Sequence, residues 1–133
     1  MRLCVFSERM RPPFDEGIKN VALHLIRGLR QRHQVLALTT EYYRPGAGDL
    51  VSEGIRCVAG NPLLLSPQLA LAVRRFRPDL ILYVPTACAT PFSFLRSRLL
   101  KRYGRGAPVV LVALQWRSHG PLSRSLMRRL RPE

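Results

Sequence analysis

Residues 1–40, MRLCVFSERMRPPFDEGIKNVALHLIRGLRQRHQVLALTT, decide the fold of this chain. Their continuous apolar run at 3–6 predicts a strand over 2–7 that is covered on both faces, as in a parallel sheet. Pro12 and Pro13 interrupt regular structure, and Asp15 is expected to cap the helix that follows. With a second strand at 34–39, the stretch predicts one βαβ unit whose first loop lies where open α/β sheets bind ligands.

The expected helix carries one apolar stripe, and its polar residues should be solvated. The stripe consists of Ile18, Val21, Ala22, Leu25 and Leu29. The residues expected in solvent are Lys19, Asn20, His24, Arg27 and Arg30.

The rest of the chain repeats the alternation of strand and helix. Strands are expected at 55–58, 79–84 and 109–114, and helices at about 66–76, at 91–103 and at 121–130. Thr90 is placed as the N-cap of the helix at 91–103. This order predicts an α/β fold with a doubly wound, mostly parallel Rossmann-like sheet and helices on both faces. We expect one domain over residues 1–133.

Composition limits the class of protein. The chain has 22 Lys and Arg against 8 Asp and Glu, a net charge of +14, which suits nucleic acid, an anionic membrane or a phosphorylated ligand without choosing among them. The hydrophobic fraction of 47% excludes a disordered chain. Cys4, Cys57 and Cys88 form no CxxC pair, which disfavours a disulfide or zinc framework and favours the cytoplasm.

Membrane contact is expected to be peripheral if it occurs. The N-terminus has no signal-peptide core, and no apolar run approaches the ~20 residues that span a bilayer. The helix at 121–130 has Leu on one face and Arg on the others. It could cover the strand at 109–114 or lie against an anionic inner membrane surface.

Four motifs in this order resemble the N-terminal half of GT-B glycosyltransferases of the group called family four, or group one. They are Pro12-Pro13, Glu16-Gly17-Ile18, Arg32-His33-Gln34-Val35 and Pro78-Asp79-Leu80-Ile81. The resemblance implies a retaining, metal-independent enzyme with its active site between two Rossmann-like domains. The nucleotide-sugar donor is then a co-substrate, and no other cofactor is expected.

The resemblance also implies that the two domains bind different substrates. The N-terminal half holds a lipid, saccharide or small-molecule acceptor, while a C-terminal domain, absent from this sequence, holds most donor contacts. We therefore expect residues 1–133 to be inactive alone, and a longer chain to transfer sugar. No nucleic-acid partner is expected.

The candidate site residues lie at the carboxyl edge of the predicted sheet. The turn Glu16, Gly17, Ile18 and Lys19 should face the donor phosphate, since helix N-termini bind anions. The family has two glycines here, and this chain has only Gly17. Arg9 and Thr86 follow strands that end at the same edge, and we expect them to contact the substrate or the donor as well. Glu8 lies either in the cleft or in a loop as an exposed charge.

Two residues after the last strand are candidates for catalysis. Many family members carry a histidine where this chain has Gln115, and His119 follows four residues later. Glutamine can orient a hydroxyl but cannot act as a general base near neutral pH. The choice between the two stays open. No metal is expected, because neither His24 nor His33 has ligands at metal-binding spacing.

Two other functions are consistent with parts of the sequence. A freestanding basic α/β module that binds nucleic acid or another polyanion would use the +14 charge, although the arginines are dispersed and no RNA- or DNA-binding signature is present. A nicotinamide-binding domain would need GxGxxG after the first strand, which this chain lacks.

Overall fold

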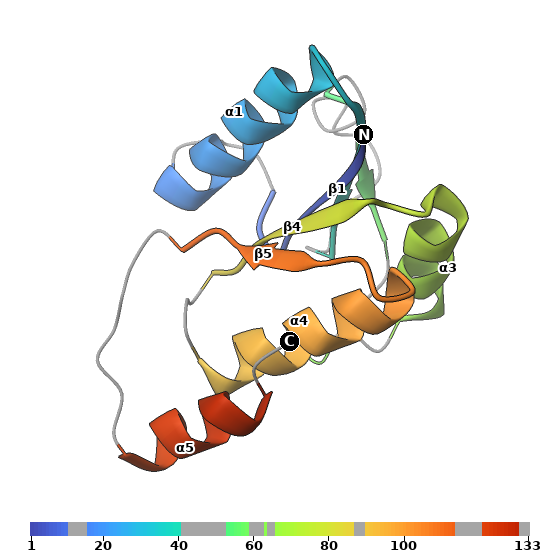
Figure 1. The fold of residues 1–133 in the computed structure, drawn as a ribbon. Helices are drawn as coiled ribbons and strands as arrows, with labels where there is room; N and C mark the ends of the chain where they lie inside the picture. Colours follow the sequence, from blue (N-terminus) through green and yellow to red (C-terminus); the bar gives the residue numbers. More distant parts are fainter. Residues whose placement is uncertain are drawn as a thin grey trace.

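The sheet is parallel and has five strands in the described part of the chain. They are β1 (Arg2–Ser7), β2 (Gln34–Thr39), β3 (Ile55–Cys57), β4 (Leu80–Val84) and β5 (Val109–Leu111), in the spatial order β3-β2-β1-β4-β5 (Figure 1). The computed structural model describes residues 1–10, 16–40, 53–58, 63, 66–86, 90–113 and 121–130. The predicted α/β class and doubly wound order are confirmed.

The central strand β1 explains why the first apolar run decides the fold. It pairs with β2 on one side and β4 on the other, so that Val5 lies opposite both Ala37 and Leu82. Residues 3–6 are all buried, as expected for a strand covered on both faces.

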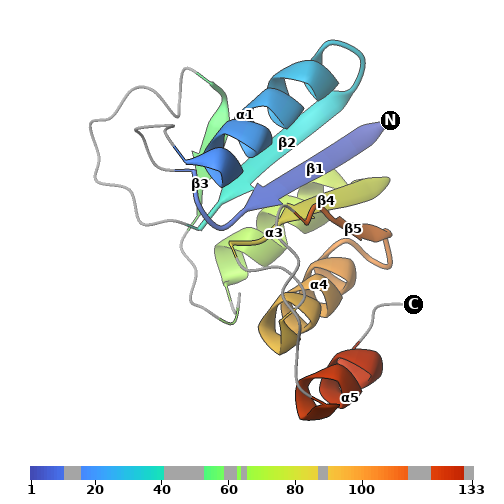
Figure 2. The same ribbon diagram turned by 90° about the vertical axis from the view of Figure 1, so that its left-hand side faces the viewer.

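Helices cover both faces of the sheet (Figure 2), and each face of the sheet has its own hydrophobic cluster. On one face, α1 (Gly17–Arg30) packs on alternate strand residues such as Val5 and Ala37. On the other, α3 (Pro67–Phe76) and α4 (Pro91–Tyr103) pack over Phe6 and Tyr83.

The starts of α3 and α4 agree with the predicted positions, and the predicted N-cap Thr90 is confirmed. Ser66 accepts the Leu69 amide at 3.2 Å, and Thr90 forms a reciprocal capping box with Ser93. The predicted cap of α1 was wrong: its N-cap is Glu16, whose side chain makes no capping hydrogen bond. Asp15 lies outside the described residues.

The buried face of α1 also differs from the predicted stripe. Ala22, Leu23, Ile26 and Lys19 are buried, whereas Ile18, Leu25 and Leu29 only flank the core. The spacing 19, 22, 23, 26 is equally helical, so the helix is rotated by a fraction of a turn from the predicted face. Lys19, expected in solvent, has a side chain only 8% exposed.

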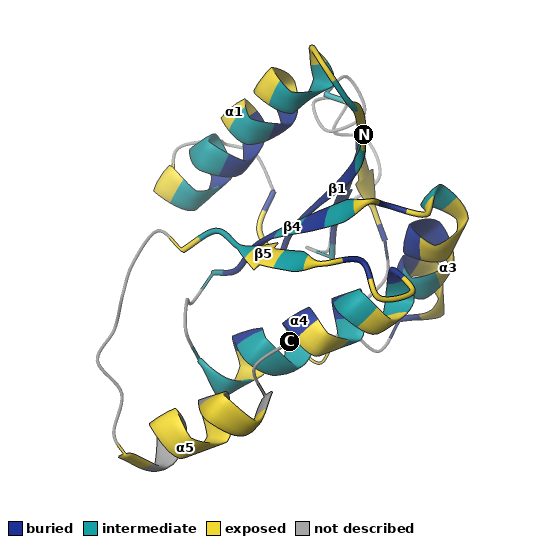
Figure 3. Ribbon diagram, in the orientation of Figure 1, coloured by how far each residue is buried: buried dark blue, intermediate teal, exposed yellow. Residues whose placement is uncertain are grey.

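The last helix, α5 (Pro121–Leu130), does not cover β5. It packs against α4, on the side away from the sheet, and Arg98 Nη1 donates to the Arg129 carbonyl at 3.4 Å (Figure 3). The expectation that this helix covers the strand at 109–114 was therefore wrong. In addition, β5 ends at Leu111, so it is shorter than the strand predicted at 109–114; residue 114 lies outside the described residues.

Candidate functional site at the carboxyl edge

The topological switch point of the sheet lies between β1 and β4. From β1 the chain passes to α1 on one face, and from β4 it passes to α4 on the other. Open α/β sheets usually bind ligands between the carboxyl ends of two such strands, and we call this position the crevice.

Glu8, the residue after β1, joins three elements at this crevice. Its Oε1 accepts the Tyr83 hydroxyl and Arg96 Nη1, the latter at 2.5 Å. Its Oε2 accepts the Thr86 hydroxyl at 2.6 Å and the Thr86 amide at 3.3 Å. The side chains of Glu8 and Arg96 are only 13% and 17% exposed. One carboxylate thus ties β1 to β4 and α4.

Local structure explains why each donor reaches Glu8. Tyr83 lies opposite Phe6 in the β1–β4 register and its ring packs on the Phe6 ring, with centroids 5.6 Å apart. Tyr83 is fully buried, so its hydroxyl needs a partner. Burial, and then the Glu8 carboxylate, raise the Tyr83 pKa well above its usual range. The capping box and Pro91 fix the start of α4 and so direct Arg96 inward.

The Glu8 carboxylate has little capacity left for a ligand. A carboxylate offers about four acceptor positions, and two donors already occupy each oxygen. Glu8 therefore acts as a positioning group that holds the crevice wall. Thr86 donates its hydroxyl hydrogen to Glu8, so toward a substrate its oxygen can only accept.

Arg9, Glu16 and Lys19 form a second group at this edge. Glu16 lies 3.5 Å from Arg9 Nη1 and 3.4 Å from Lys19 Nζ. One half-exposed carboxylate thus holds two cations at the start of α1, and the trio keeps a net positive charge. Lys19 buries its aliphatic stem while its ammonium reaches Glu16, a usual arrangement for lysine. The sequence grouped these three residues, and the structure brings them together.

The N-terminus of α1 lies at the same edge. The side chain of its N-cap residue Glu16 makes no capping hydrogen bond, and among the described residues a Cβ added at Gly17 would meet nothing within 4 Å. The first amides of a helix without a side-chain cap, together with the helix dipole, suit an anion. Ile18 packs against the core, so only its backbone amide could contribute.

The candidate catalytic residues Gln115 and His119 lie outside the described residues. The chain before them does reach the crevice, since the Val112 amide donates to the Tyr83 carbonyl at 2.8 Å. Gln115 follows three residues later. Their contacts and the choice between them stay predictions.

The sequence reading missed Tyr83 and Arg96. A tyrosine in a fully buried strand signals a need for a hydroxyl partner, and Glu8, at the end of the neighbouring strand, was available. Arg96 lies beside the buried Ser93 and Ser97 on α4, which could have marked it as facing inward.

No protein-family model, curated protein or solved structure matches the chain. Within the described ranges, no group of three His, Cys, Asp or Glu could hold a metal ion. None of the helices in those ranges has the length and apolarity to cross a membrane.

Proposed function

We propose that the chain is the acceptor-side half of a retaining GT-B glycosyltransferase that takes a sugar from a nucleotide-sugar donor. The crevice between β1 and β4 would form one wall of the active-site cleft. A second domain would supply most donor contacts, and no cofactor besides the donor is invoked.

The observation that supports this proposal best is the N-terminus of α1 at the switch point, where the N-cap residue Glu16 makes no side-chain capping hydrogen bond. It lies in the turn that resembles the family's glycine turn, and Arg9 and Lys19 stand beside it. An anion-binding helix N-terminus at this edge is the arrangement that a donor diphosphate needs.

The roles follow from the chemistry of each group. The amides of residues 17–19 and the Lys19 ammonium would contact the donor phosphate, while Glu16 holds Lys19 and Arg9 in place. The Thr86 oxygen would accept a hydrogen bond from a sugar hydroxyl. Gln115 would orient the acceptor, and His119 is the alternative proton acceptor because histidine is the commonest general base in enzymes.

Peripheral membrane contact at the inner face is part of this proposal. Arg124, Arg128 and Arg129 of α5 are exposed, and so is Leu126, a mixture that suits an anionic lipid surface. Flotation with phosphatidylglycerol vesicles but not phosphatidylcholine vesicles tests it, and equal flotation with both contradicts it.

A titration resolved by residue tests the proposed donor site. The ¹⁵N-labelled chain is titrated with UDP-glucose and GDP-mannose while its amide resonances are followed. We expect saturable shifts at residues 17–19, with the weak, millimolar affinity of half a site. Lys19→Met should abolish them, and Lys101→Met, which removes the same charge from α4, should not.

Two outcomes would sink the proposal. One is the absence of shifts at residues 17–19 with every donor tried. The other is an enzymatic result: nucleotide-sugar turnover should be absent from residues 1–133 and present in a chain extended past Glu133, so an extended chain without turnover counts against it.

A further inference from the structure

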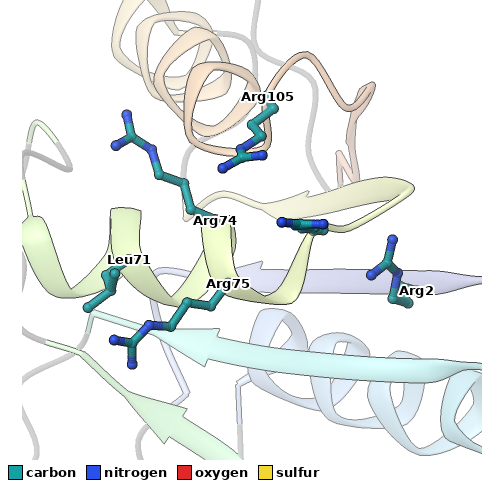
Figure 4. A pocket seen from close by; sticks show the side chains of 6 residues that line it. Arg2, Leu71, Arg74, Arg75 and Arg105 are labelled. Carbon is teal, nitrogen blue, oxygen red and sulfur yellow. The ribbon is translucent and has the colours of Figure 1, made fainter.

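Five arginines line a pocket of about 540 Å³ at the opposite, amino edge of the sheet (Figure 4). They come from three places: the start of β1, the C-terminal end of α3 and the turn after α4. The lining consists of Arg2, Leu71, Arg74, Arg75, Arg77 and Arg105. A pocket of this size suits a small ligand, since such sites commonly measure roughly 300–1,000 Å³.

Within the described part of the chain, the positive charge of this pocket is largely uncompensated. The four described carboxylates are each engaged by a cation: Glu8 by Arg96, Glu16 by Arg9 and Lys19, Glu53 by Arg27, and Asp79 by Arg2. Consequently Arg74, Arg75, Arg77 and Arg105 have no carboxylate partner within the described ranges.

Two of these arginines hold an unfavourable backbone conformation. Arg77 and Arg105 have φ of 51° and 58°, and they are the two non-glycine residues with positive φ in the described chain. Arg77 ends α3 in the left-handed conformation, where glycine is the common residue. Such strain tends to occur at functional positions. Both strained residues line this one pocket.

Structural explanations account for only part of the cluster. Basic residues in the last turn of a helix interact favourably with its dipole, which explains Arg74 and Arg75. This does not explain Arg77 and Arg105, whose positions favour glycine. The two helix C-termini bring about half a negative charge each, so with Asp79 they offset about two of the five positive charges.

We propose that this pocket binds a small oligophosphate, an anion with at least two linked phosphate groups. Arg74 and Arg75 come from α3 and Arg105 comes from the turn after α4, so guanidinium groups from two separate elements line the same pocket (Figure 4). Guanidinium groups on two sides match two phosphates better than one, because each can bind phosphate oxygens in bidentate fashion.

Nucleic acid fits this pocket less well than a small anion. Leu71 is the one apolar residue of the lining, which contains no aromatic side chain on which a base could stack. The pocket is also at the sheet edge opposite the proposed donor site, so the two proposals can fail separately.

Calorimetric titration of the whole chain with tripolyphosphate, pyrophosphate and orthophosphate tests the oligophosphate site. Tripolyphosphate and pyrophosphate should bind more tightly than orthophosphate. Arg74→Gln/Arg105→Gln should weaken tripolyphosphate binding on the order of tenfold or more. Arg124→Gln/Arg128→Gln removes two exposed charges from α5 and should leave the affinity within about twofold.

A glycine variant separates binding from folding. Arg77→Gly/Arg105→Gly relieves both left-handed positions, so its melting temperature should stay the same or rise while tripolyphosphate affinity falls. Unchanged affinity in this variant would overturn the site.

Three further results would overturn the proposal. Equal losses in the α5 control would mean that net charge alone attracts the anion. Orthophosphate binding as tightly as pyrophosphate would remove the need for two phosphates. A short single-stranded RNA that binds more tightly than tripolyphosphate, and that loses affinity in the Arg74/Arg105 variant, would make nucleic acid the ligand.

Discussion

Replacing Glu8 by glutamine should destabilise the protein strongly, because it removes the charge on which the crevice network depends. The glutamine oxygen can face Arg96 and Tyr83, and its amide group then faces Thr86. The Thr86 hydroxyl can rotate to accept from that amide, but the Thr86 backbone N–H loses its acceptor. In the opposite orientation the amide group meets the Arg96 guanidinium.

The magnitude follows from the burial of the pair. A hydrogen bond to a charged group contributes about 1.5–3 kcal/mol, and breaking a fully buried ion pair costs about 3–5 kcal/mol. Since Glu8 and Arg96 keep 13% and 17% of their side-chain area exposed, we expect a loss of about 2–3 kcal/mol in the free energy of unfolding. For a chain of this length that is roughly 6–15 °C in melting temperature.

Urea unfolding followed by circular dichroism measures this loss, with Glu16→Gln as the matched control. Glu16 also faces two cations but is 48% exposed, so its replacement should cost less than about 1 kcal/mol. A double-mutant cycle with Arg96→Met should give a coupling above about 1 kcal/mol. If Glu8→Gln cost no more than Glu16→Gln, the network would not be what holds β1, β4 and α4 together.

Two further predictions concern single residues. Gly104→Ala should lower the free energy of unfolding by about 1–3 kcal/mol, because its Cβ would come within 2.8 Å of Ile81 Cδ1. Gly28→Ala meets open space and should raise that free energy by about 0.5–1 kcal/mol, so urea unfolding must give opposite signs for the two variants. Burial raises the Cys4 pKa to about 12, so the folded protein keeps the thiol proton above the unfolded value of about 8.5. The free energy of unfolding should fall as the pH rises above about 8.5, by up to about 1.4 kcal/mol per pH unit more than in Cys4→Ala. Equal pH dependence in the two proteins would refute this prediction. At pH 8, iodoacetamide should modify the exposed Cys57 and spare Cys4.

Local signals predicted most of the fold. The run at 3–6 is buried between two helical layers, Thr90 caps its helix as expected, and the helix expected from about residue 66 begins at Pro67. These features depend on neighbours within a few residues, which a sequence displays directly. The face of α1 and the position of α5 depend instead on how helices pack on the sheet and on each other. Hydrophobic periodicity does not fix the rotation of a helix about its axis to within one residue. For that reason it predicts Lys19 in solvent, whereas the structure buries it.

The sequence predicted where the candidate site lies but not the contacts within it. The order of strands brings Arg9, the α1 turn and Thr86 to one edge, and that placement is confirmed. The network around Glu8 joins residues 75 to 88 positions apart, and no local pattern encodes which donor reaches which carboxylate. The sequence leaves Glu8 open as a cleft group or a loop charge, whereas in the structure four donors saturate its oxygens and it fixes the position of Thr86.

The two edges of the sheet use their charges in different ways. At the carboxyl edge, Glu8 and Glu16 each hold cations in fixed positions, as a site needs when it must orient a neutral sugar and a charged phosphate together. At the amino edge, Arg2 pairs with Asp79, but the other four pocket arginines keep no carboxylate partner within the described residues, and two of them occupy positions that favour glycine. A diffuse attraction to nucleic acid or membrane would need neither the carboxylate pairing at one edge nor the strained arginines at the other. The two proposals, each with a ligand of defined geometry, therefore account for features at both edges that the net charge of +14 alone would not require.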